Sequence, residues 1–146
     1  MSPAVWTSPC GRFWLEAYRP GDERRFTLRA DMAEAWTASG HRLPGGPKWT
    51  MHDMRQLETL GIGGLEPEGA AASLGWFLCA DLSARQWMAA LDAVRDRLAW
   101  ARGRAVRRVH VLVAADRPGA AGMMGRVGFR LTGQEGDDAV MTRELN

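Results

Sequence analysis

The chain is short of the residues that several classes of protein require. Only two cysteines, Cys10 and Cys79, occur among its 146 residues, which excludes a disulfide scaffold and predicts a reducing compartment. No apolar run approaches the length of a membrane-spanning helix. The first ten residues hold two prolines and no apolar core of signal-peptide length. We therefore expect a cytoplasmic protein that makes no contact with a membrane.

Lysine is almost absent, and the charges nearly cancel. Lys48 is the only lysine among 19 basic residues, and the net charge is +2, which is too small to predict a nucleic-acid partner. Four arginines gather between positions 102 and 108: Arg102, Arg104, Arg107 and Arg108. They fit either the end of a helix, whose dipole favours cations, or an anion-binding patch. Three histidines and two distant cysteines show no ligand spacing, so no metal site is predicted.

What is present is typical of a folded globular chain. Apolar residues make up 46% and charged residues 25%, and the length fits one domain over residues 1–146. We expect residues 1–11 to form a loose N-terminal segment. Seven tryptophans are many for this length, and amphipathic tryptophan is common at interfaces as well as in cores.

Hydrophobic periodicity in the first half predicts one helix among short strands. The helix is expected over residues 22–38, where apolar residues recur every three or four positions. Residues 43–47 hold two prolines and two glycines, which predicts a loop. The expected strands are 13–19, 49–53, 57–65 and 73–80. The last three form an antiparallel meander with a turn at residues 66–69.

The clearest helix follows this meander. Ser83 and Gln86 form an S-x-x-Q capping box, and apolar residues continue at helical spacing from Trp87 to Ala101. The nearly continuous apolar run at residues 109–115 predicts a central strand buried on both faces.

A short helix and a strand pair complete the chain. Pro118 is placed to open the helix, with Asp116 as its cap and an end near Gly128. The strand pair is expected at residues 129–132 and 139–145. With this pair counted as one unit, the order is β-α-β-β-β-α-β-α-β, which predicts an α/β or α+β fold with one mixed sheet.

The residues after the apolar strand carry a recognisable pattern. From Arg117 to Phe129 the chain reads R-P-G-A-A-G-M-M-G-R-V-G-F. This resembles the N-P-x-A-x-x-L-Y-x-x-x-G-F segment of the GNAT superfamily of acetyltransferases, with Pro118, Ala120 and Gly128 on the pattern. The segments 28–34 and 75–83 are also similar to a phage group of that superfamily, described as acetyltransferase-like or internal virion proteins. The resemblance implies a GNAT-like acyl-CoA N-acyltransferase fold.

The resemblance also implies a function and a site. A GNAT enzyme moves an acetyl group from acetyl-CoA to an amine, and acetyl-CoA would lie between the strands at 73–80 and 109–115. Its pyrophosphate would bind the loop at residues 81–87. The residues that this implies for acetyl-CoA binding are Phe77, Leu78, Cys79, Ser83, Ala84, Arg85, Gln86, Arg117, Ala120 and Met124. The catalytic residues are left open, with Asp31, Glu34 and Cys79 as candidates.

The sequence departs from the family pattern at two places. The family loop R/Q-x-x-G-x-G/A contains glycines, whereas this chain has Gln86 and Met88 at those positions and no glycine from 76 to 102. The position of the usual tyrosine acid holds Met124, which has no proton to give, and Tyr18 is the only tyrosine.

Two main functions of different classes therefore stay open, beside a nucleic-acid-binding module that rests only on the arginines between positions 102 and 108. The first is an N-acetyltransferase that acts on an unidentified amine. The second is a non-catalytic protein on the same fold, such as a virion-associated or host-interacting phage component. The second predicts an exposed apolar patch at one of Trp6, Trp14 and Trp49. A homodimer is compatible with both functions.

Overall fold

The structure is a computed structural model that describes residues 3–146, and it is a mixed α/β protein. Its strands are β1 (Ala4–Thr7), β2 (Phe13–Ala17), β3 (Lys48–Asp53), β4 (Glu58–Pro67), β5 (Ala72–Cys79), β6 (Arg108–Ala114), β7 (Arg130–Glu135) and β8 (Asp138–Glu144). Its helices are a 3-10 turn, η1 (Asp22–Arg24), and three α-helices, α1 (Ala30–Ala38), α2 (Ala84–Gly103) and α3 (Pro118–Arg126). The predicted fold class is confirmed, and so is the predicted element order apart from β1 and η1.

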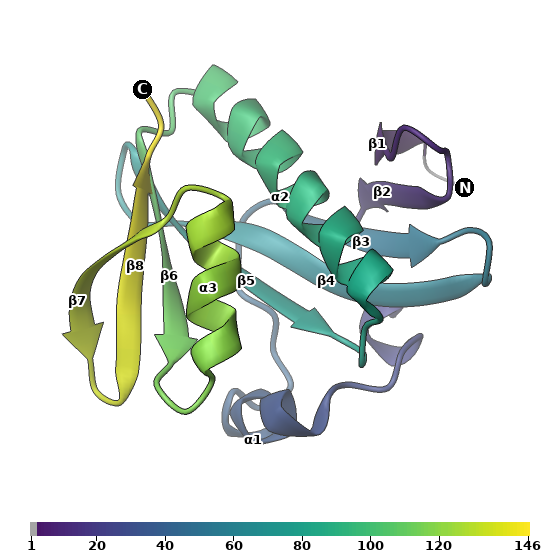
Figure 1. Cartoon of the computed structure of the whole chain (residues 1–146), viewed down its shortest axis with the longest axis horizontal. Helices are drawn as coiled ribbons and strands as arrows, with labels where there is room; N and C mark the ends of the chain where they lie inside the picture. Colours follow the sequence, from purple (N-terminus) through teal and green to yellow (C-terminus); the bar gives the residue numbers. More distant parts are fainter. Residues whose placement is uncertain (1–2) are drawn as a thin grey trace. The chain divides into compact units, whose positions relative to one another are not determined.

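The strands form one mixed sheet in the order β1-β2-β3-β4-β5-β6-β8-β7. The pairs β1–β2, β2–β3, β3–β4, β6–β8 and β7–β8 are antiparallel. The pair β5–β6 is parallel, which requires a crossover, and α2 lies between these two strands in the chain (Figure 1).

The contacts divide the chain into two compact units. The first comprises Met1–Gly64 and Phe77–Ala93, and the second comprises Leu65–Trp76 and Val94–Asn146. The strands β4 and β5 and the helix α2 therefore contribute residues to both units. That residues 1–146 form one domain stays a prediction.

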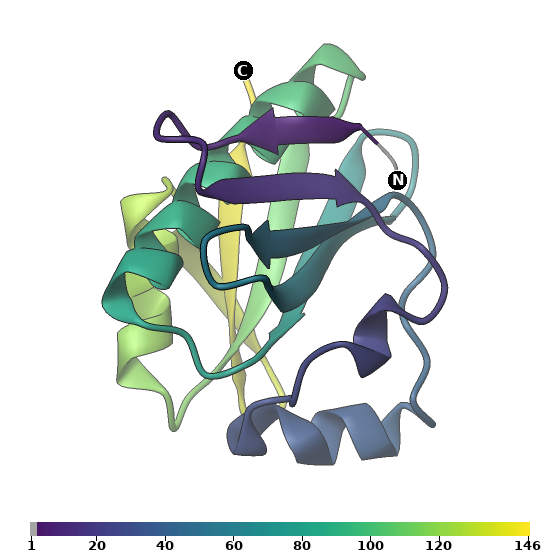
Figure 2. The ribbon, with the colours of Figure 1, turned by 90° about the vertical axis from the view of Figure 1, so that its right-hand side faces the viewer.

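The first unit packs β2, β3 and β4 around an apolar core. Figure 2 shows the β1–β2 hairpin, in purple, beside β3. Leu15 of β2 is paired with Met51 of β3, and both are buried. The buried side chains of these three strands include Phe13, Leu15, Trp49, Met51, Leu60 and Ile62.

The expectation of a loose segment at residues 1–11 is wrong for its described part. Ala4–Thr7 form β1, which pairs with β2. The turn between them is closed by Ser8, whose backbone N–H donates to the Phe13 carbonyl at 2.9 Å and whose hydroxyl accepts the Phe13 N–H at 3.0 Å. Residues 1 and 2 lie outside the described part of the chain.

The single helix predicted for residues 22–38 is divided into η1 and α1. Gly21 has a φ of 101°, and the buried Asp22 accepts a 2.6 Å hydrogen bond from the Thr50 hydroxyl. Before α1 the chain is extended at Arg29, whose N–H donates to the Cys79 carbonyl at 3.0 Å. These long-range contacts hold the backbone out of helical geometry, and periodicity within the segment contains no trace of them.

The second unit has β6 between β5 and β8. Its buried apolar side chains include Leu65, Leu98, Ala101, Val109, Val113, Val127, Phe129, Met141 and Leu145. The prediction that β6 is buried on both faces is only partly correct, because Leu112 is 40% exposed. The helix α3 begins at Pro118 as predicted, but Arg117 is its N-cap residue and no side chain caps it, so the predicted Asp116 cap is wrong.

Two of the clustered arginines have partners inside the second unit. The guanidinium of Arg108 pairs with Glu144 across β6 and β8 at 2.8 Å, and Arg104 lies 4.8 Å from the centre of the Trp100 ring. These contacts favour a structural role for the arginines between positions 102 and 108 over an anion-binding patch.

None of the helices formed by residues 3–146 has the length and apolar character of a membrane span. In the same range, no group of three or more His, Cys, Asp or Glu side chains is placed to hold a metal ion.

Candidate functional site

Most of the predicted site residues lie in the first unit, at the end of β5 and the start of α2. Phe77, Leu78 and Cys79 are the last three residues of β5. Four further residues, 80–83, lead into α2 at Ala84, so the predicted helix start is observed and the predicted loop at residues 81–87 continues into the first turn of α2.

The first turn of α2 is closed by the predicted capping box. The Ser83 N–H donates to the Gln86 side-chain oxygen at 2.9 Å, and the Gln86 N–H donates to the Ser83 hydroxyl at 3.2 Å. Two backbone donors at this helix end are therefore satisfied by the protein itself. The first-turn N–H groups outside the box are those of Ala84 and Arg85, and the exposed Arg85 side chain adds a positive charge there.

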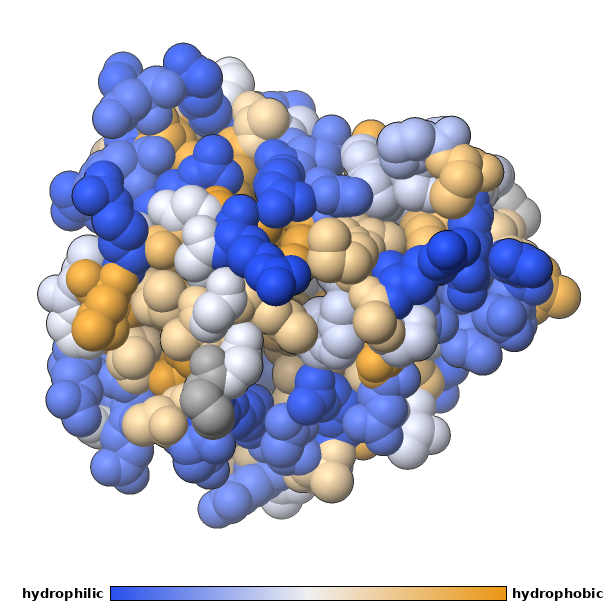
Figure 3. Space-filling view, viewed as in Figure 1, coloured by the Kyte–Doolittle hydropathy of each residue, from blue (hydrophilic) through white to orange (hydrophobic). Residues whose placement is uncertain are grey.

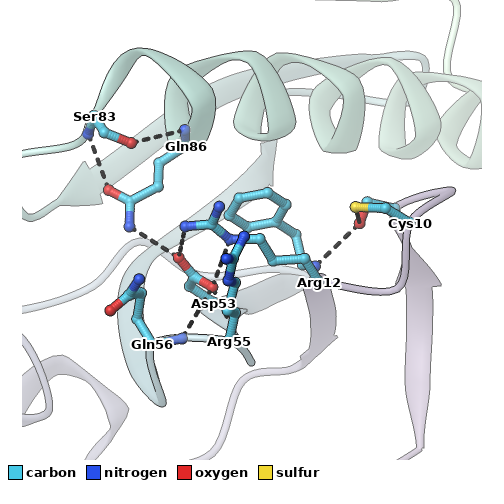
Figure 4. A network of polar contacts seen from close by, with 9 residues as sticks. Cys10, Arg12, Asp53, Arg55, Gln56, Ser83 and Gln86 are labelled. Carbon is cyan, nitrogen blue, oxygen red and sulfur yellow. Dashed lines mark hydrogen bonds and ion pairs between the residues drawn. The ribbon is translucent and has the colours of Figure 1, made fainter.

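A buried carboxylate, Asp53, supports this capping box through a hydrogen bond with the Gln86 side chain (Figure 4). Asp53 has no exposed surface. It accepts hydrogen bonds from the Arg12 guanidinium at 3.0 and 2.8 Å and from the Gln86 side-chain amide at 3.1 Å. It also accepts the backbone N–H groups of Arg55 and Gln56 at 3.1 and 3.3 Å.

These donors stabilise the charged form of Asp53. The Arg12 guanidinium is the largest cause, and with the Gln86 amide it lowers the pKa of Asp53 from 3.8 to about 2, against the opposing effect of burial. Asp53 closes a local turn, since it accepts the N–H groups two and three residues ahead. Its partners Arg12 and Gln86 lie 41 and 33 positions away and leave no signal in local spacing.

A second contact group joins the start of α1 to the same region. The Arg29 guanidinium bonds Asp31 at 3.1 and 3.0 Å and lies 5.4 Å from the centre of the Trp87 ring. Trp87 meets Phe77 edge to face at 6.0 Å. The side chain of Phe77 is partly exposed, so an aromatic pair and a guanidinium lie at the end of β5.

The three catalytic candidates lie in different environments. Asp31 and Glu34 are exposed on α1, and Asp31 is paired with Arg29. Cys79 is 4% exposed, and burial raises the pKa of its thiol to about 11. The thiol is therefore protonated near neutral pH, which favours a packing role for Cys79. Tyr18 donates its hydroxyl to Glu23 at 2.5 Å, and burial followed by this contact raises its pKa to about 12.

The remaining predicted site residues lie in the second unit, within α3 or immediately before it. Arg117 is the residue before the helix, and Ala120 and Met124 lie within it. Met124 is buried. The assignment of these three residues to acetyl-CoA stays a prediction.

The second unit also contains the parallel strand pair β5–β6. Its ladder has three residue pairs, Ala72 with Arg108, Ser73 with Val109 and Leu74 with His110. By contrast, β6 is paired with β8 along its whole length, from Arg108 to Ala114. The β5-facing edge of β6 therefore continues beyond the ladder, and an extended amide-containing ligand can pair with such an edge.

An orphaned polar atom belongs to β5, two residues beyond the ladder with β6. The indole nitrogen of Trp76 on β5 is buried and has no hydrogen-bond partner within residues 3–146. An open strand edge and a free donor fit an acyl-CoA, whose pantetheine arm is extended and rich in carbonyl oxygens. The capped end of α2 offers a phosphate fewer backbone donors than a glycine loop would.

Comparison with solved structures identifies the fold. The chain superposes on a GCN5-related N-acetyltransferase from Kribbella flavida with a TM-score of 0.66 at 17% identity, over 91% of this chain and 98% of that one. A chimera of the Vibrio cholerae spermidine N-acetyltransferase SpeG and hSSAT gives a TM-score of 0.66 at 15% identity, over 92% and 96%. The dodecameric spermidine N-acetyltransferase of Vibrio cholerae gives 0.64 at 13%, over 92% and 94%.

Structural comparison finds similar proteins, whereas comparison with family models and curated sequences finds none. No protein-family model and no curated protein sequence matches the chain. The structural similarity covers nearly all of this chain and of each neighbour, at identities that establish the fold alone. The chain has the GNAT fold of acyl-CoA N-acyltransferases.

Proposed function

We propose that the protein is an N-acetyltransferase that binds acetyl-CoA and transfers its acetyl group to an amine. The observation that carries this proposal is the short parallel ladder between β5 and β6, which leaves an edge of β6 open within the sheet. Such an edge can pair with the amides of an extended pantetheine arm. The structural neighbours support the proposal, since they are N-acetyltransferases.

The residues at the start of α2 are proposed to bind the phosphate groups. The N–H groups of Ala84 and Arg85 lie at the positive end of a twenty-residue helix, and the Arg85 guanidinium supplies a full charge. The proposed binding group in this unit also includes Phe77, Leu78, Cys79, Ser83 and Gln86. Gln86 and Ser83 act by fixing the shape of the turn, because their own polar groups bond each other.

The chemistry requires proton transfer as well as positioning. Acetyl-CoA supplies an activated thioester, and the acceptor nitrogen forms a bond to the carbonyl carbon as the carbon–sulfur bond breaks. The acceptor must lose a proton and the departing thiolate must gain one. Asp31 and Glu34 are exposed carboxylates on α1, and we propose them as groups that attract the cationic amine and accept its proton. Positioning contributes much of the rate in this design, so the lack of a tyrosine at Met124 does not prevent the reaction.

A non-catalytic role is the second candidate, and one observation favours it. The capping box uses two N–H groups that a phosphate would otherwise bind, and the turn has no glycine. The tryptophan patch that this role predicts is not supported, because Trp49 is buried and Trp6 and Trp14 are only half-buried. On the face shown in Figure 3, hydrophilic and hydrophobic residues are interspersed.

The test is an acetylation assay with acetyl-CoA and a panel of amines that includes spermidine. We expect release of the CoA thiol with at least one amine. Arg85→Glu should lower the affinity for acetyl-CoA at least tenfold, which corresponds to about 1.4 kcal/mol of binding free energy. Arg130→Glu on the exposed strand β7 is the matched control and should bind as the wild type does. A folded Arg85→Glu variant with unchanged affinity contradicts the assignment of the α2 turn.

A further inference from the structure

Trp76, on β5 in the second unit, has a hydrogen-bond donor without a partner. Its indole nitrogen is buried, and it is the one buried side-chain nitrogen or oxygen without a partner in the part of the chain that the structure describes. A buried polar group that gives up water without gaining a partner is costly, and native proteins rarely retain one. Such a donor is explained when a ligand supplies the acceptor.

The position of Trp76 in the second unit indicates what that ligand meets. Trp76 follows Leu74, the last β5 residue in the ladder with β6, by two positions. Alternation places it on the same face of β5 as Leu74. On β6, Leu112 follows His110 by two positions and shares its face, and Leu112 is 40% exposed although its strand lies inside the sheet.

Gly75 keeps the two strands close just before this point. A Cβ atom at Gly75 would lie 3.1 Å from a methyl carbon of Val111 and 3.4 Å from one of Val109. The ladder thus runs tightly up to its last pair, and the donor of Trp76 and the exposed side chain of Leu112 come directly after it. A ligand that continued the pairing would meet an apolar side chain and a free N–H donor together.

We infer that the Trp76 indole N–H donates a hydrogen bond to a carbonyl oxygen of the acyl donor, a thioester of coenzyme A. The inference rests on the proposed function, because it takes the acyl donor to lie along the open edge of β6. A carbonyl oxygen suits the position, since it accepts a hydrogen bond and needs none donated to it. Two kinds of carbonyl are available in acetyl-CoA, the amides of the pantetheine arm and the thioester.

Nuclear magnetic resonance of the indole N–H groups tests this directly. The seven tryptophans give seven indole signals, and Trp76→Phe assigns one of them by deleting it. We expect the Trp76 signal to move downfield and its exchange with water to slow when acetyl-CoA is added. A shift with CoA as well as acetyl-CoA identifies a pantetheine amide as the acceptor, and a shift with acetyl-CoA alone identifies the thioester.

Calorimetry on the same proteins separates the possible failures. Trp76→Phe should weaken acetyl-CoA binding about tenfold, the equivalent of one hydrogen bond of about 1.4 kcal/mol. Trp100→Phe on α2 is the matched control, and it should leave the affinity unchanged. Binding by the wild-type protein with an unmoved Trp76 signal overturns the inference alone. No binding by the wild-type protein overturns the proposed function and this inference together.

Discussion

Replacing Asp53 by asparagine should destabilise the first unit more than any other single polar change in it. The substitution keeps the size of the side chain and removes its charge. It leaves the Arg12 guanidinium, which is 16% exposed, without its bidentate partner. It also points an amide N–H₂ group toward donors on Arg12 and Gln86. Removing one partner of a buried ion pair costs about 3–5 kcal/mol. Because water reaches Arg12, we expect about 2–4 kcal/mol.

The pH dependence provides an independent estimate of the same interaction. The pKa of Asp53 is lowered from 3.8 to about 2, so its charge stabilises the folded state above pH 3.8. That contribution is lost as the pH falls toward 2. At 1.36 kcal/mol for each pKa unit, this shift is worth about 2 kcal/mol. The difference in stability between wild type and Asp53→Asn should therefore narrow as the pH falls below 4.

Urea denaturation followed by circular dichroism measures both effects. Asp137→Asn, at an exposed turn position, is the matched control and should lie within about 0.5 kcal/mol of the wild type. The reasoning is refuted if Asp53→Asn is as stable as the control near neutral pH. It is also refuted if the difference between wild type and variant does not change in the acid range.

Three other outcomes follow from the contacts described above. Ser83→Ala and Gln86→Ala should each cost about 1 kcal/mol in urea denaturation, and the double variant should cost less than the sum because the two side chains cap each other. Gly61→Ala should destabilise the protein by about 2 kcal/mol or more, since the new Cβ would lie 2.5 Å from the Leu78 carbonyl oxygen. Gly122→Ala in α3 should stabilise the protein by about 0.5–1 kcal/mol, because its Cβ would meet nothing within 4 Å. Equal melting temperatures for the two variants would contradict this expectation. Cys10 is exposed, and its pKa is lowered chiefly by a hydrogen bond to Ser8. Near neutral pH the Cys10 thiol should therefore react with a disulfide reagent far faster than the thiol of Cys79. A fast phase of the reaction that survives Cys10→Ser would contradict that order.

Local patterns predicted the elements whose causes are local. The capping box at Ser83 and Gln86 is a short-range device, and both of its hydrogen bonds are present. The prediction of one helix at residues 22–38 was wrong because the contacts that divide it are long-range. Asp22 bonds Thr50, which lies 28 positions away, and no periodicity within the segment records that contact. The strand β1 was missed for a similar reason, because it forms by pairing with β2 and its own residues give no local signal of that pairing.

The sequence predicted the strand and the helix that carry the candidate site, but not the contacts that support them. The resemblance placed Phe77 to Gln86 at the end of a strand and the start of a helix, where they lie. It did not find Asp53 or Trp76. The Arg12 and Gln86 side chains that bond Asp53 lie 41 and 33 positions away, and the role proposed for Trp76 depends on an unpartnered N–H donor that only atomic positions reveal.

The measurement that tests the central claim most directly is a calorimetric titration of the intact protein with acetyl-CoA and, separately, with CoA. The account predicts saturable binding of one molecule per chain in the micromolar range, weakened by salt because Arg85 and the α2 N-terminus contribute charge. No heat of binding up to millimolar acetyl-CoA would contradict it. The GNAT fold would then serve a purpose other than acyl transfer.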